Sequence, residues 1–234
     1  MRRDAIALGR NYLLSLGGEG LQSGFHFGLN LLLIRLLSAY DYGVFAIVFI
    51  LGGIALTYGN ALVSIPANIQ IAQMKSARAA SFHDVVFGSV TLAICVVGGF
   101  IVSLGLSLTI RSATEAWADG LFVALWTLRN HVRNATFARQ AMSTVVVADF
   151  AYAVTGIALI AGCLWVWGGG LQASLVLLTL AVANAVGIGV ALIASGRKVR
   201  VSFRPNVRRS ISRRGRTSAG RSSGSPCGTC RVRA

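Results

Sequence analysis

Apolar residues run along the chain in six long blocks that are separated by shorter polar or charged segments. A helix needs about 20 predominantly apolar residues to cross a bilayer, whereas a membrane β-strand needs only about ten. The blocks therefore predict an all-α, polytopic membrane protein, a bundle of six transmembrane helices. The expected spans are about 13–37, 43–65, 84–110, 117–137, 144–167 and 173–195.

The first block, 13–37, is unusual because polar side chains interrupt it. At about 100° per residue these side chains fall within about 60° of one helix meridian. Polar groups at membrane depth are costly and usually face a bundle interior or a water-filled cavity. We therefore expect this polar face to point into the bundle rather than toward lipid. Its members are Glu19, Gln22, Ser23, His26 and Asn30.

The residues of this face do not all point to the same chemistry. Glu19 lies about 9 Å inside the expected span at 1.5 Å per residue, where a carboxylate needs a proton or a neighbouring cation. It is a candidate proton-carrying or cation-pairing site. His26 could share a proton path with it, although a lone buried histidine is more often part of a packed core. Gln22 and Asn30 are equally well explained as interhelical hydrogen bonds.

Glycines form a second stripe on the same helix, at Gly20, Gly24 and Gly28. Small residues at this spacing let another helix approach closely. The sequence leaves open whether that helix belongs to the same bundle or to a partner chain.

The fourth block, 117–137, becomes basic toward its end, with Arg129 and Arg133 one helical turn apart. Guanidinium groups present forked donors that match phosphate oxygens. The alternative is that both side chains reach lipid headgroups at the inner surface. Arg129 is the better site candidate because it lies deeper. Asp149 could pair with either arginine or simply lie at the membrane interface. Glu19 could pair with Arg129 if the first and fourth helices are neighbours.

Composition supports the membrane assignment, with 55% hydrophobic and only 12% charged residues. Soluble domains are about 45–50% apolar and about 25% charged. If the N-terminus is cytoplasmic, the inner segments hold eleven Lys/Arg and the outer loops hold only Arg111. Cytoplasmic loops carry an excess of such residues, so we expect both termini of the six-span bundle in the cytoplasm.

The net charge of +15 comes mostly from the end of the chain. Residues 1–196 hold ten Lys/Arg and seven acids, including a basic arm at 1–12, whereas residues 197–234 hold twelve Lys/Arg and no acid. From Pro205 onward the chain is too polar to bury a core, so we expect 197–234 to be a disordered basic cytoplasmic tail. Its composition is also what a shifted reading frame in GC-rich DNA would produce, and we interpret the frame as lost near 205–210.

The sequence offers no nucleophile triad, phosphate-binding glycine loop or metal-ligand cluster, so we expect neither an enzyme nor a cofactor. Cys227 and Cys230 have CxxC spacing, but one pair supplies only two metal ligands. The tail arginines favour anionic membrane lipid as a partner. Nucleic acid is not expected, because aromatic residues and a folded module are missing around them.

Residues 32–46 carry an apolar run, Arg35, a Leu-Leu pair and a short turn, followed by Asp41, Tyr42 and Gly43. This order resembles the opening of polysaccharide flippases, the O-antigen or lipid-linked oligosaccharide translocases of the multidrug/oligosaccharidyl-lipid/polysaccharide exporter superfamily. The basic fourth block, followed by Arg139 and Asp149, is similar to the same family. The resemblance covers about residues 8–200.

The resemblance implies one lobe of a two-lobe exporter in the bacterial inner membrane. Such a transporter moves lipid-linked oligosaccharide to the outer leaflet for polysaccharide and lipopolysaccharide biosynthesis, through a cationic or polar lumen between the lobes. Family members have twelve or more spans, so a second lobe or a homodimer would complete the transporter. Two alternatives stay open. One is a non-transporting truncated lobe or scaffold that binds a partner through the glycine face. The other is a permease subunit of an ATP-driven exporter, with 68–81 as its coupling segment.

Overall fold

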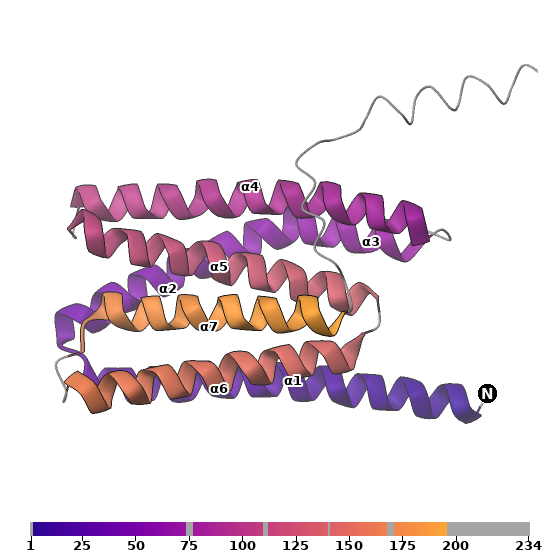
Figure 1. Cartoon of the computed structure of the whole chain (residues 1–234), viewed down its shortest axis with the longest axis horizontal. Coiled ribbons are helices and arrows are strands. Elements are labelled where there is room, and N and C mark those ends of the chain that lie inside the picture. The colour runs from indigo at the N-terminus through magenta and orange to yellow at the C-terminus, as the bar shows by residue number, and fades with distance from the viewer. Residues whose placement is uncertain (1, 74–76, 110–111, 140, 168–170, 196–234) are drawn as a thin grey trace, which may run out of the picture. The chain divides into compact units, whose positions relative to one another are not determined.

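The computed structural model describes residues 2–73, 77–109, 112–139, 141–167 and 171–195. Every regular element in these ranges is a helix, which confirms the all-α expectation (Figure 1). The expected tail 197–234, with its CxxC pair and the interpreted loss of frame, lies outside the described residues. The helices are α1 (Arg2–Leu36), α2 (Ala39–Gly59), the π-helix η1 (Asn60–Ser64), α3 (Ile65–Gln73), α4 (Ala77–Thr109), α5 (Ala113–Ala138), α6 (Met142–Trp167) and α7 (Ala173–Ala194).

The fifth helix occupies the centre of the bundle. α5 packs between α4 and α7 and also contacts α2, while α6 packs on α7 and α1 packs on α6 (Figure 1). Its apolar face meets these neighbours in a core of fully buried side chains. The most deeply buried members include Leu33, Phe45, Phe122, Leu177 and Leu180. The polar end of α5 is therefore also surrounded by helices.

Glycines set the separation between α4 and α5. A Cβ added to Gly99 would lie 2.7 Å from the carbonyl oxygen of Gly120, and one added to Gly120 would collide with Ser103 Oγ and the Gly99 carbonyl. Only hydrogen fits at these two positions. Backbones that approach this closely are typical of helices packed through small residues.

Four stretches of helix are long and apolar enough to cross a membrane: Ala39–Gln70, Val85–Thr109, Met142–Val166 and Ala173–Ala194. They carry large apolar side chains on outward faces, such as Ile50, Leu108 and Ile157. The other two expected spans also form helices, within α1 and α5. These two helices are long enough to cross a membrane, but their polar residues make them less apolar than the other four.

The second expected span is longer than its predicted bounds of 43–65. We expected a connection to begin at Pro66, but the helix continues through that proline to Gln73. Proline removes a backbone N–H and crowds the preceding turn, which usually ends or bends a helix. Here the turn before it is the π-helix η1, whose wider hydrogen-bonded ring runs from the Asn60 carbonyl to the Ile65 N–H. The wide turn lets the chain remain helical.

The N-terminal arm 1–12 is also not a separate element, because α1 already begins at Arg2. The first helix thus extends well before the expected start of the span at residue 13.

Candidate functional site

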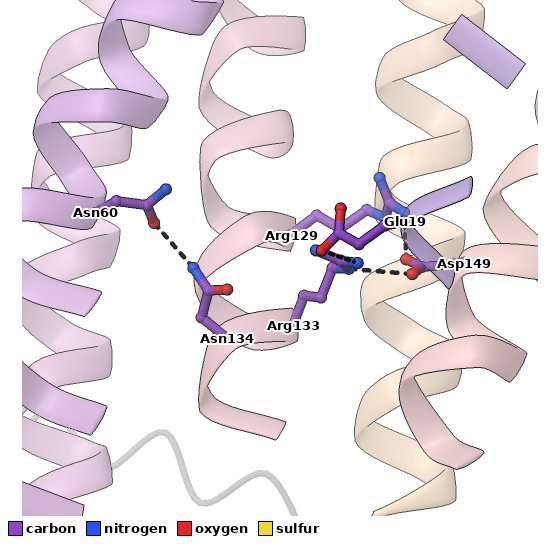
Figure 2. A network of polar contacts seen from close by, with 6 residues as sticks. All are labelled: Glu19, Asn60, Arg129, Arg133, Asn134 and Asp149. Atoms are coloured by element: carbon purple, nitrogen blue, oxygen red, sulfur yellow. Dashed lines mark hydrogen bonds and ion pairs between the residues drawn. The ribbon is translucent and has the colours of Figure 1, made fainter. Parts of the chain in front are cut away.

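Two arginines of α5 and one aspartate of α6 form a buried charge cluster (Figure 2). Arg129 Nη2 donates to Asp149 Oδ1 at 2.5 Å, and Arg133 Nε donates to Asp149 Oδ2 at 3.0 Å. The three side chains are only 4%, 9% and 3% exposed. Their helical spacing explains the geometry, because residues four apart lie one above the other on one face. A single carboxylate can therefore bridge both guanidinium groups.

Glu19 closes the cluster from α1. Arg133 Nη2 donates to Glu19 Oε1 at 2.9 Å, and the Glu19 side chain is 56% exposed. The neighbouring Gly18 also lies against the cluster, since a Cβ there would be in van der Waals contact with Asp149 Oδ2 at 3.5 Å. The cluster thus contains two cations and two carboxylates. One carboxylate is buried, and the other lies at the accessible edge.

The contacts differ from one sequence expectation. Glu19 bonds Arg133 rather than Arg129, and α1 lies against α6 instead of α5 among the described helices. The long Arg133 side chain reaches from α5 to Glu19 of α1. The idea that Asp149 pairs with either arginine was too narrow, because it pairs with both.

Arg129 is held by more than its ion pair. Its guanidinium carbon lies 3.8 Å from the centre of the Tyr152 ring, and Tyr152 is fully buried. A desolvated cation over an aromatic face gains about 2 kcal/mol or more. Tyr152 follows Asp149 by three residues, so one face of α6 supplies both the carboxylate and the ring. Sequence reasoning gave Tyr152 no role, although this spacing was a usable signal.

Gly187 of α7 makes the room for this stack. A Cβ added there would lie 3.2 Å from Arg129 Nε and 3.3 Å from Tyr152 Cβ. We predict that Gly187→Val lowers the free energy of unfolding by about 1–3 kcal/mol, because the added methyls overpack the site. Gly189→Val is the matched control, since a Cβ at Gly189 would meet nothing within 4 Å in the described part of the chain. Denaturant titration in mixed micelles measures the free energy of unfolding of both variants. Equal values for the two would contradict the prediction.

The remaining polar residues of α1 behave differently from Glu19. His26 is surrounded by the rings of Phe25, Phe49, Trp126 and Tyr152, with centroids 5.4–6.0 Å away. Neither of its ring nitrogens, nor Gln22 Oε1, has a hydrogen-bond partner among the described residues. Asn30 Nδ2 donates to the His26 carbonyl oxygen of its own helix at 2.9 Å. Ser23 is exposed. Asn30 therefore satisfies itself locally, whereas Gln22 and His26 are inward polar groups.

The glycine stripe does not pack inside the bundle. A Cβ at Gly20, Gly24 or Gly28 would meet nothing within 4 Å in the described structure. Of the two possibilities left open by the sequence, the described bundle therefore supplies no neighbour for this stripe. α1 instead presents a bulky side to α6, where Phe25 fills the space above Gly156. The small residue of that contact is on α6, and the glycine face of α1 stays open.

A second polar group lies on another side of α5, facing η1. Asn130 Nδ2 and Asn134 Nδ2 each donate to Asn60 Oδ1 at 2.8 Å. Ser64 Oγ and His131 Nδ1 share a hydrogen bond of 3.2 Å, and both side chains are buried. Sequence reasoning missed this group. Asn60 was visible as a polar residue in an apolar block, but nothing in the sequence indicated that it faces α5.

Comparison of the chain with protein-family models, with curated proteins and with solved structures gives no match. Among the described residues, no group of three or more histidine, cysteine or acidic side chains could hold a metal ion. The charge cluster offers forked hydrogen-bond donors, and its outer carboxylate, Glu19, is exposed.

Proposed function

We propose that the chain is a membrane transport protein, the N-terminal six-span lobe of a flippase that moves lipid-linked oligosaccharide across the bacterial inner membrane. The observation that carries this proposal is the Arg129–Asp149–Arg133–Glu19 cluster inside a bundle of largely apolar helices. In this proposal α1, α2 to α3, α4, α5, α6 and α7 are the six spans, and both termini are cytoplasmic.

The cluster suits a diphosphate-linked lipid because it can exchange one anion for another. Two cations inside a bilayer are costly unless they are paired. Asp149 neutralises one charge from a buried position, so it is the fixed partner. Glu19 neutralises the other from an exposed position. A phosphate oxygen that replaces Glu19 would meet the same guanidinium fork, which matches phosphate geometry.

This arrangement divides the work between the two arginines. Arg129 is fixed between Asp149 and the Tyr152 ring. Arg133 is bonded to both carboxylates, and its outer partner is the exposed one. An incoming anion would therefore reach Arg133 first, while Arg129 adds positive potential behind it. Return of Glu19 to Arg133 would then release the anion.

A binding measurement tests the proposal with the chain alone in lipid nanodiscs and a polyprenyl diphosphate sugar as the probe. We predict that Arg133→Lys weakens binding by roughly 10-fold or more, since hydrogen bonds to charged groups contribute about 1.5–3 kcal/mol and lysine lacks the fork. Glu19→Gln should tighten binding, because it removes the competing carboxylate. Arg35→Lys is the control, as Arg35 is an exposed arginine of α1. Unchanged binding in Arg133→Lys would overturn the assignment.

The six-span topology has its own test. We predict that cysteines introduced at 112–116 react with a membrane-impermeant reagent added outside intact cells, whereas cysteines at 76–80 do not. The expectation rests on the excess of basic residues in the inner segments. The opposite labelling pattern would overturn the orientation, and labelling at both places would mean that the intervening helix does not span.

A second candidate function is a non-transporting lobe or scaffold that binds a partner helix. The open faces of Gly20, Gly24 and Gly28 favour it, since such a face accepts a close helix. The diphosphate measurement separates the two candidates. A scaffold would bind the probe no better than a lipid without phosphate, whereas the flippase lobe requires binding that depends on Arg133.

A further inference from the structure

The π-helix η1 is tied to α5 at both of its ends. Its first residue, Asn60, accepts hydrogen bonds from Asn130 and Asn134, each at 2.8 Å. Its last residue, Ser64, shares a hydrogen bond with His131 at 3.2 Å. These bonds join two elements that are 67 to 74 residues apart in the sequence. η1 itself lies within one long apolar stretch of helix, Ala39–Gln70.

Two features weaken the helix at this turn. A π-turn is rare and often lies at a functional position, and helices bend sharply at such turns and at prolines. η1 is followed after one residue by Pro66, which has no N–H to donate. A cavity of about 10 Å³ also borders the turn, between Gly59, Asn60, Thr127 and His131. The backbone ladder therefore lacks one donor here, and a space of about the size of one water lies beside it.

The residues of α5 that hold η1 adjoin the residues that form the charge cluster. Asn130 follows Arg129, and Asn134 follows Arg133, so each pair is separated by about 100° around one helix. Figure 2 shows Asn60 and Asn134 on one side of α5, with both arginines and Asp149 on the other. One rigid helix therefore transmits any rotation from the asparagine side to the arginine side.

We propose that η1 is a hinge between α2 and α3, and that Asn60 is the latch that holds this hinge against α5. With the latch closed, α5 keeps the rotation that aims Arg129 and Arg133 at Asp149. With the latch open, α3 moves relative to the rest of the bundle and α5 loses one restraint on its rotation. Asn60 is then a positioning residue for the arginines, which it does not touch. The inference concerns motion within the chain, so it stands or falls independently of transport.

Distances between spin labels in the full chain in nanodiscs test the hinge. One pair, Ile69 of α3 and Val147 of α6, reports across the hinge. The other pair, Ile50 of α2 and Ile157 of α6, reports on the side of η1 that should not move. All four side chains are 53% or more exposed, so labels replace no core contact. The four native cysteines are first replaced by alanine.

We expect Asn60→Leu to shift or broaden the 69–147 distance distribution, or to add a second maximum, while the 50–157 distribution stays as in the unsubstituted chain. Asn60→Asp should restore the original 69–147 distribution, because it keeps an oxygen that accepts both amide donors. Asn68→Leu is the matched control, since Asn68 lies beyond the hinge in α3 and has no side-chain hydrogen bond to another described residue.

Two results would overturn the proposal. If Asn60→Leu leaves the 69–147 distribution unchanged in folded protein, Asn60 holds no latch. If both label pairs change alike, or if Asn68→Leu changes the first pair as much, the asparagine stabilises the bundle generally and η1 is not a hinge. Deleting Ala61, an exposed residue of the wide turn, gives a second test. In that shortened background the effect of Asn60→Leu should disappear, and its persistence would place the motion elsewhere.

Discussion

Replacing Asp149 by alanine is expected to lower the free energy of unfolding by about 3–5 kcal/mol, the usual cost of removing one partner from a buried ion pair. The expected loss is large because Asp149 serves two arginines, and both are buried. Without it, Arg129 keeps the Tyr152 ring but has no carboxylate among the described residues. Denaturant titration in mixed micelles measures the change.

Glu19→Ala is the internal control for this prediction. It removes the other carboxylate of the same cluster, but from a side chain that is 56% exposed. Exposed ion pairs contribute about 0–1 kcal/mol, so its effect should be several-fold smaller than that of Asp149→Ala. Equal effects of the two substitutions would show that water or lipid headgroups reach Asp149 in the membrane.

A third variant separates stability from function. Exchanging Arg129 and Arg133 for methionine and Asp149 for leucine replaces the cluster by apolar residues of similar volume. Such replacements are often neutral or stabilising, so this variant should fold at least as well as the single Asp149→Ala variant. It should nevertheless lose binding of the polyprenyl diphosphate probe. If the variant keeps its stability but loses binding of the probe, the charge cluster serves binding and not stability.

The apolar pattern predicted the helices well because length and hydropathy depend on one segment at a time. All six expected blocks are helical, and four contain stretches that are apolar enough to cross a membrane. The same local reasoning placed Arg129 and Arg133 on one face of α5. Within one helix, the spacing of two residues in the sequence determines whether their side chains lie on the same face.

Relations between helices were less predictable. Glycines 20, 24 and 28 were interpreted as a packing face, yet the tightest glycine contacts of the described bundle lie elsewhere. They join Gly99 to Gly120, Gly52 to Trp126 and Gly156 to Phe25. A sequence shows where a close approach is sterically allowed, but the neighbour decides whether it occurs. The helical continuation through Pro66 was missed for a related reason. It depends on η1, and η1 is bonded to side chains of α5 that no local pattern connects to it.

The contact between α4 and α5 gives the second large prediction. Gly99→Val should lower the free energy of unfolding by about 3 kcal/mol or more, at the upper end of what overpacking costs. A Cβ at Gly99 would lie 2.7 Å from the Gly120 carbonyl oxygen and 3.0 Å from Ala124 Cβ. Backbone cannot rotate away as a flexible side chain can, so α4 and α5 would have to separate.

Gly98→Val controls for this substitution at the adjacent position of the same helix. A Cβ at Gly98 would meet nothing within 4 Å in the described structure, while the change in helix propensity and in side-chain volume is identical. The difference between the two variants therefore isolates the helix contact. α5 carries the arginines, so separation from α4 should also weaken binding of the diphosphate probe in Gly99→Val but not in Gly98→Val. If both variants unfold at the same denaturant concentration, α4 and α5 do not meet through these glycines in the membrane.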